Sequence, residues 1–186
     1  MYTTAYQRLF QGFLLILLDL RIQFFDILPD FVGYILVFRA LGILASQHLN
    51  FSKAKPFALA LIFLSLTNLL PFTQANLLEY SFSTQELGWL VIGQAIILTE
   101  LFLLYWIIQG IYEVAKDRGN EELQEKAQFR WKFYFIATSV LLVYTPFALN
   151  LDPAWVQLMI LFVVALFLAM LLILGLIRSA GRELKD

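Results

Sequence analysis

The sequence contains no cysteine and a single histidine, His48, among its 186 residues. Without cysteine there are no disulfides and no thiolate chemistry, so the chain carries no redox signature. One histidine without a second ligand near it supports neither a zinc site nor a Ser-His-Asp arrangement. The nine glycines are scattered and form no phosphate-binding loop. We therefore expect no enzymatic activity, no catalytic residues, no metal and no cofactor.

Charge is also scarce, and it is nearly balanced. Charged residues make up 15% of the chain, against about 25% in soluble domains, and the net charge is -1. A chain without a basic excess cannot neutralise a phosphate backbone, which argues against nucleic acid as a partner. Hydrophobic residues instead make up 61% of the chain, and the mean hydropathy is +0.77. This composition is typical of an integral membrane protein whose main solvent and partner is the lipid bilayer.

Apolar runs of about 17–25 residues, the length that crosses a bilayer, predict six transmembrane helices. The cleanest run, PAWVQLMILFVVALFLAMLLILGLI, contains no charged residue and is apolar on every side, as a lipid-exposed helix should be. The expected fold is an all-α, polytopic membrane helix bundle in which residues 1–186 form one transmembrane domain. The predicted spans are about 9–28, 31–47, 57–72, 88–112, 133–149 and 154–178, with a charged hairpin at 113–132.

Basic residues are confined to alternate connections between these spans. Lys or Arg residues precede the first span and occur in the 48–56 loop, the 113–132 hairpin and the C-terminal tail. The other three connections, DILPD, TQANLLEYSFSTQE and LNLDPA, contain acids but no Lys or Arg. Cytoplasmic loops are the ones enriched in basic residues. We therefore expect a multi-pass plasma-membrane protein with an even number of spans and both termini in the cytoplasm.

Four ionisable residues fall inside the predicted spans, near the bilayer midplane. They are Asp19 and Arg21 in the first span, Arg39 in the second and Glu100 in the fourth. An unpaired charge at this depth costs at least ~2.5–3.5 kcal/mol on insertion scales, so a mutually neutralising cluster is the favourable arrangement. We expect the first, second and fourth helices to meet around these four side chains.

Polar neighbours outline a lining for this charged cluster. Gln11, Asp19 and Gln23 share one stripe of the first predicted helix. Arg39 shares a face of the second with small residues, which favour close approach of helices. Asn68, near the outer end of the third span, is a further candidate, although an amide there is more typical of helix–helix hydrogen bonding than of a ligand.

Two interpretations of the cluster are open. Intramembrane acids beside arginines mark ion or proton pathways, which favours a small ion- or proton-coupled transporter. Asp19 and Glu100 would then bind the proton or cation, with Arg21 and Arg39 as counter-charges or anion contacts. An ion-pair cluster can also serve only to fix helix register. The alternative function is then a non-transporting scaffold or regulator that binds a partner membrane protein through the 113–132 hairpin. Another copy of this chain is a further candidate partner.

The first predicted span has an alternative of its own. Asp19, Arg21 and Gln23 make it costly to insert, so it either crosses the bilayer with partners for these groups or lies partly in the interface. Acids and no basic residues in the following DILPD turn favour the crossing.

The segment DILPDFVGYILVFRALGIL covers residues 26–44. It resembles a segment of a loose group of small multi-pass membrane proteins of Gram-positive bacteria, of the form LPdFiGYiLi…GL. The matching residues are Ile27 to Gly33, Tyr34 to Leu36, and Leu41-Gly42. The resemblance implies a bacterial plasma-membrane protein and no particular mechanism.

Overall fold

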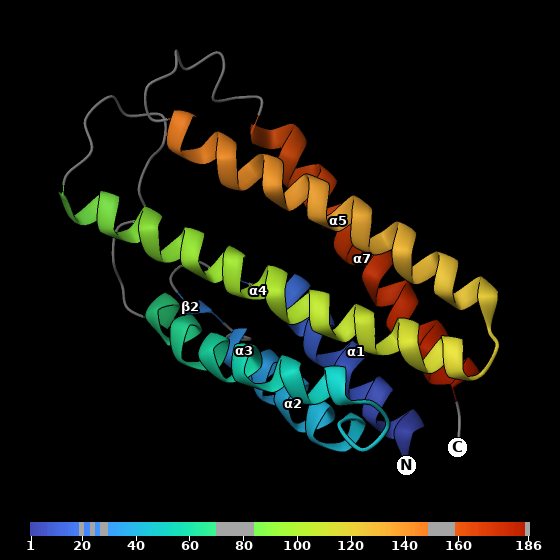
Figure 1. Ribbon diagram of the computed structural model, residues 1–186. Helices are drawn as coiled ribbons and strands as arrows, with labels where there is room; N and C mark the ends of the chain where they lie inside the picture. Colours follow the sequence, from blue (N-terminus) through green and yellow to red (C-terminus); the bar gives the residue numbers. More distant parts are fainter. Residues whose placement is uncertain (19–20, 23–24, 27–29, 70–83, 149–158, 185–186) are drawn as a thin grey trace.

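Six α-helices make up most of the described chain, joined in places by very short turns (Figure 1). The computed structural model describes residues 1–18, 21–22, 25–26, 30–69, 84–148 and 159–184. A short 3-10 helix, η1 (Leu66–Leu69), continues the third helix. The all-α class predicted from composition is therefore confirmed. The helices are α1 (Tyr2–Leu18), α2 (Asp30–Leu44), α3 (Leu49–Ser65), α4 (Thr84–Asp117), α5 (Glu121–Ala148) and α7 (Met159–Glu183).

The helices form a ring in chain order. Each packs chiefly against the helix before and the helix after it, and α7 closes the ring by packing on α1. Successive helices alternate in direction, so Figure 1 shows both chain ends, the α2–α3 turn and the α4–α5 turn at one end of the bundle. We call this the basic end, because most of the Lys and Arg residues lie on the helix ends that gather there. The connections that contain Lys and Arg, which were predicted to lie on one side, are therefore at one end of the bundle.

The helices α1 and α2 approach each other closely at two glycines. A Cβ atom added to Gly12 would lie 2.7 Å from the Gly33 carbonyl oxygen and 2.8 Å from Val37 Cγ2. A Cβ atom on Gly33 would lie 2.6 Å from a side-chain atom of Ile16. Only glycine allows the two backbones to touch in this way, as at other small-residue helix crossings.

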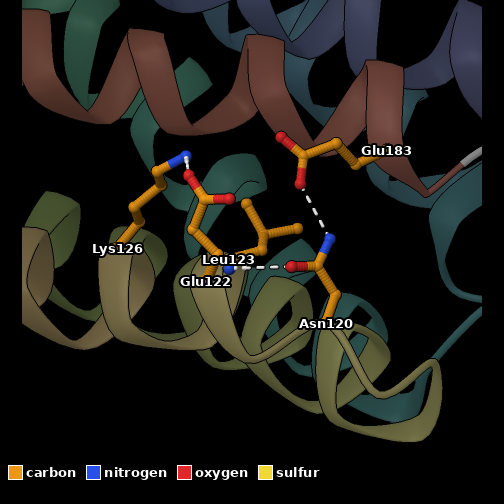
Figure 2. Close-up of polar contacts among 5 residues, drawn as sticks. All are labelled: Asn120, Glu122, Leu123, Lys126 and Glu183. Carbon is orange, nitrogen blue, oxygen red and sulfur yellow. Dashed lines mark hydrogen bonds and ion pairs between the residues drawn. The ribbon is translucent and has the colours of Figure 1, made fainter.

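The corner between α4 and α5 is made by Gly119 and Asn120. Gly119 has φ 68°, and the Asn120 N–H donates to the Ala115 carbonyl at 2.9 Å, so α4 ends in a Schellman motif. Asn120 Oδ1 accepts from the Leu123 N–H at 3.0 Å and caps α5. The same side chain donates through Nδ2 to Glu183 Oε2 at 2.7 Å, which ties the corner to the end of α7 (Figure 2).

Two predicted boundaries are wrong. The first predicted helix, 9–28, begins earlier, at Tyr2, and ends at Leu18. Residues Arg21–Ile22 (β1) and Phe25–Asp26 (β2) pair as antiparallel strands instead, with Arg21 opposite Asp26. The apolar helical pattern stops at Leu18, because three polar residues follow within five positions. They are Asp19, Arg21 and Gln23. The second error is the 48–56 loop, which belongs to α3 because His48 Nδ1 accepts from the Asn50 N–H at 3.2 Å and caps that helix.

Two helices of the described chain are long and apolar enough to cross a membrane, over Leu90–Asp117 and Ile160–Glu183. By contrast α1, α2 and α3 contain 17, 15 and 17 residues. At 1.5 Å per residue they are about 22–26 Å long, shorter than the ~30 Å hydrocarbon core of a typical bilayer.

Candidate functional site

An acidic side chain, Glu100, lies at the middle of α4 and faces the interior of the ring. Its Oε1 atom is buried and has no hydrogen-bond partner in the part of the chain that the structure describes. Glu100 interacts electrostatically with Asp30 and Tyr34 of α2 and with Tyr134 of α5. Since α2 and α5 are not adjacent in the ring, a group that reaches both is central. We call Asp30, Tyr34, Glu100, Tyr134 and Thr138 the acidic cluster.

Helical phase brings these side chains to the interior. Asp30 and Tyr34 are four residues apart on α2, and Tyr134 and Thr138 are four apart on α5, so each pair shares one helix face. Tyr34, Tyr134 and Thr138 are 3%, 4% and 0% exposed. The hydroxyls of Tyr134 and Thr138 are close, although their geometry falls short of a regular hydrogen bond. The three hydroxyl groups are therefore enclosed by helices, whereas Asp30 and Glu100 are half-buried.

The acidic cluster consists of oxygen-bearing side chains. It combines two carboxyl groups, two phenols and one aliphatic hydroxyl. Glu100 makes no ion pair with any Lys or Arg in the described part of the chain. No three acidic or histidine side chains of that part lie together as a multidentate metal site requires. A buried carboxylate without a counter-charge is costly, and a bound proton or monovalent cation would neutralise it.

A further buried hydroxyl lies on the same face of α5, farther from the basic end. Thr145 is two helical turns, or about 10 Å, beyond Thr138. It is 8% exposed, and its Oγ1 donates to the Leu141 carbonyl at 2.8 Å. On α3, Ser65 is 3% exposed and donates to the Ile62 carbonyl at 3.1 Å. Hydroxyls therefore continue along the interior from the acidic cluster away from the basic end.

Toward the basic end, aromatic packing closes the interior. The rings of Tyr6 and Phe51 meet edge to face with centroids 6.3 Å apart, and both residues are fully buried. Phe51 fills the space beside Gly110, where a Cβ atom would lie 2.8 Å from the ring, and Tyr6 fills the space beside Gly181. The Tyr6 hydroxyl donates to Gln47 Oε1 at 2.9 Å.

Of the residues predicted to form the site, Glu100 is in the interior, whereas Arg39 and Gln11 are not. Arg39 is exposed on α2. It lies roughly 140–180° around that helix from Tyr34 and Asp30, since successive residues are about 100° apart. Gln11 is exposed on α1, whose outward face also carries Gln7. The predicted polar stripe of the first helix therefore begins on the outside of the bundle, opposite to what we expected.

The remaining predicted site residues fall largely outside the described part of the chain. Asp19 and Gln23 lie outside it, and only the backbones of Arg21 and Asn68 are described, in β1 and η1. Arg21 comes after the end of α1, so it does not lie within that helix as predicted. The expected meeting of the first, second and fourth helices is also not the main packing, because α4 packs chiefly on α3 and α5.

Asp30, Tyr34, Tyr134 and Thr138 are not among the site residues predicted from the sequence. Asp30 falls in the predicted DILPD connection, Tyr34 in the segment that carries the resemblance, and Tyr134 and Thr138 in the fifth predicted span. A usable signal was present, because each pair places polar groups at i and i+4 in an otherwise apolar helix. That spacing indicates a shared face, but only packing decides whether the face points inward.

The predicted cytoplasmic hairpin, 113–132, is helical on both sides of the Gly119–Asn120 corner. Near the corner, Lys126 donates to Glu122 one turn away along α5 (Figure 2). This hydrogen bond lowers the pKa of Glu122. The hairpin therefore presents a fixed, charged surface rather than a loop, and it is attached to α7 through Asn120.

Comparisons of this chain with protein-family models, with curated proteins and with solved structures find no match.

Proposed function

We propose that all six helices of this protein are embedded in a lipid bilayer. The support is a belt of large apolar side chains exposed on the outside of the bundle. It runs on α3 and η1 from Leu59 to Leu66, on α4 from Val91 to Phe102, on α5 from Phe135 to Phe147 and on α7 from Ile160 to Leu172. Monomeric soluble proteins rarely expose contiguous apolar surface on this scale, whereas lipid-facing helices require it.

Aromatic and basic side chains follow this belt on the side of the basic end. Tyr105 contacts both Trp106 and Trp131, with ring centroids 4.9 and 5.1 Å apart. Lys53 Nζ lies 4.6 Å from the centroid of the Trp106 ring. Tryptophan, tyrosine and lysine in one layer are typical of a membrane–water interface. This layer supports an interface near the basic end, and the excess of Lys and Arg there supports the proposal that this end, with both termini, faces the cytoplasm.

The short helices α1 to α3 are compatible with this placement. Their described lengths are a few ångströms below the thickness of an average hydrocarbon core. A bilayer thins around short spans at a cost of fractions of a kcal/mol per Å. Their outer faces carry fewer exposed large apolar side chains than those of α5 and α7.

Within this bundle, we propose, the protein is a small proton- or cation-coupled carrier whose coupling site is the acidic cluster. The observation that carries the proposal is the Glu100 carboxyl group, whose buried Oε1 has no hydrogen-bond partner among the described residues and which interacts electrostatically with Asp30. Ionisable residues retained inside a bundle despite their cost mark ion and proton pathways. This assigns the coupling role to Glu100 as expected, with Asp30 in place of Asp19, and does not require Arg21 or Arg39.

The arrangement around the cluster also fits a carrier that opens to one side at a time. Hydroxyls line the interior away from the basic end, and Tyr6 and Phe51 close it toward the basic end. A carrier requires one closed barrier and a site near the middle of the bundle, where helices can rock around it. The packed rings of Tyr6 and Phe51 would supply such a barrier at the basic end.

The experiment is a flux assay in proteoliposomes. The purified protein is reconstituted with a pH-sensitive dye inside, and H⁺, Na⁺ and K⁺ gradients are imposed in turn. Glu100→Gln, which keeps the shape of the side chain but not its charge, should reduce flux at least tenfold. Glu113→Gln is the matched control, because Glu113 is on the same helix but pairs with Lys116 on the outside at 3.7 Å.

Three results would contradict the carrier proposal. The first is an absence of ion flux in the wild-type protein under all three gradients. The second is unchanged flux in Glu100→Gln, and the third is an equal loss in Glu113→Gln. Thermal unfolding of each variant in detergent shows whether a loss of flux comes from a loss of folded protein.

A further inference from the structure

A cleft of about 280 Å³ lies between α4 and α5 near the basic end. It is away from the acidic cluster, on the outer side of the ring. Its floor includes Ile108, and its walls carry polar and aromatic groups. These are Gln109 and Tyr112 from α4, and Gln128, Trp131 and Lys132 from α5.

The donors around this cleft are unused. Gln109, Gln128 and Lys132 make no hydrogen bond or ion pair with any residue in the described ranges. Other lysines at this end do have partners: Lys126 pairs with Glu122, and Lys53 lies over an aromatic ring. A cation and two amides that converge on a cavity without partners are the groups expected to bind an anion.

The cleft also lies where the apolar belt begins. Trp131, in its wall, contacts the ring of Phe135 with centroids 5.6 Å apart. Phe135 and Ile136 are 45% and 60% exposed, and they follow the cleft on α5 in the direction away from the basic end. An anion in the cleft would therefore have a continuous apolar surface beside it. A free phosphate ion would make no apolar contact with that surface, whereas the acyl chains of a phospholipid would pack against it.

We propose that this cleft binds the headgroup of an anionic phospholipid. The Lys132 ammonium group and the Gln109 and Gln128 amides contact the phosphate, Trp131 lies against the glycerol region, and the acyl chains follow Phe135 and Ile136. Basic pockets between helices on the cytoplasmic side are a known mode of headgroup recognition. The proposal rests on the membrane placement given above but not on the transport of any ion.

The test is lipid binding by the purified protein in detergent, read out by native mass spectrometry. The probes are phosphatidylglycerol, phosphatidylcholine and free glycerol phosphate. We expect phosphatidylglycerol to remain bound in preference to phosphatidylcholine, and Lys132→Gln to weaken its binding about fivefold, the effect of one lysine near an anionic headgroup. Lys126→Gln removes the same charge from the same helix outside the cleft and should leave binding unchanged. Gln109→Leu, which keeps all charges, should weaken binding as well.

Several outcomes would overturn the assignment. Equal binding of phosphatidylglycerol and phosphatidylcholine would show that the protein does not recognise an anionic headgroup. Equal losses of binding in Lys132→Gln and Lys126→Gln would show that the cleft is not the binding site. Binding of glycerol phosphate as tight as that of the lipid would show that the site takes free phosphate compounds instead. Glu100→Gln should retain full lipid binding, so failure of the carrier proposal and failure of the lipid site are separate results.

Discussion

Replacing Gly12 by alanine tests the contact that holds α1 against α2. The new Cβ would lie 2.7 Å from the Gly33 carbonyl oxygen, a backbone atom that cannot rotate away. Ordinary contacts of this kind begin near 3.4 Å, so the two helices must separate by roughly 0.7 Å along this line. Overpacking of this kind costs about 1–3 kcal/mol.

A matched substitution removes the main complication. Alanine is favoured over glycine in a helix by about 1 kcal/mol, which partly offsets the clash at Gly12. Gly42 lies on α2, and a Cβ atom added there meets nothing within 4 Å. Gly42→Ala therefore has the gain in helix propensity without the clash. The difference in unfolding free energy between Gly12→Ala and Gly42→Ala measures the cost of the steric overlap alone.

The assay is thermal unfolding of both variants in the same detergent, followed by circular dichroism at 222 nm. For a difference of about 2 kcal/mol and a chain of this size, Gly12→Ala should unfold about 6 °C below Gly42→Ala. If Gly12→Ala unfolds at or above the temperature of Gly42→Ala, the close α1–α2 contact is refuted. Gly12→Ala combined with Gly33→Ala should be less destabilising than the sum of the two, because both force the same separation of α1 and α2.

Three further predictions concern the basic end. Tyr6→Phe removes a buried hydrogen bond and should cost about 0.5–1.5 kcal/mol in thermal unfolding, whereas Tyr2→Phe removes an exposed one of 3.3 Å and should cost less; equal effects would argue against the buried bond. Gly119→Ala forces a side chain into a backbone with φ 68° and should cost about 1–2 kcal/mol; a neutral or stabilising result would contradict the corner. The hydrogen bond from Lys126 lowers the pKa of Glu122 in the folded protein. The pair therefore stabilises α5 fully at pH values above the pKa of Glu122 in the unfolded chain, and this stabilisation is lost as the pH falls through the lowered pKa of the folded protein. Lys126→Gln should return the pKa of Glu122 upward toward its usual value in an NMR titration, and an unchanged pKa would rule out the pair.

The order of the helices was predictable because each apolar run is separated from the next by polar connections. The corner at 118–120 was partly predictable, because the charged residues on both sides of it follow helical spacing. The boundaries were less predictable. The first helix ends at Leu18, where charged residues follow an apolar run, and hydropathy averaged over a window continues across that point.

The candidate site was predictable only for Glu100. The sequence placed Arg39 beside it, yet Arg39 lies on the opposite face of α2 from Tyr34 and Asp30. Spacing within one helix determines which residues share a face, but it says nothing about the rotation of that helix relative to its neighbours. On α2 this rotation is set by the contact of Gly33 with Gly12, which turns Tyr34 inward and leaves Arg39 outside.

By itself, then, the sequence determined the helical class, the order of the helices and the gathering of basic residues at one end, because these depend on composition and spacing along the chain. Only the tertiary structure decided which polar side chains share the interior with Glu100 and where a cleft with unused donors lies on the outside. Both depend on how helices far apart in sequence pack against each other, and that packing is settled by close contacts whose geometry no periodicity records.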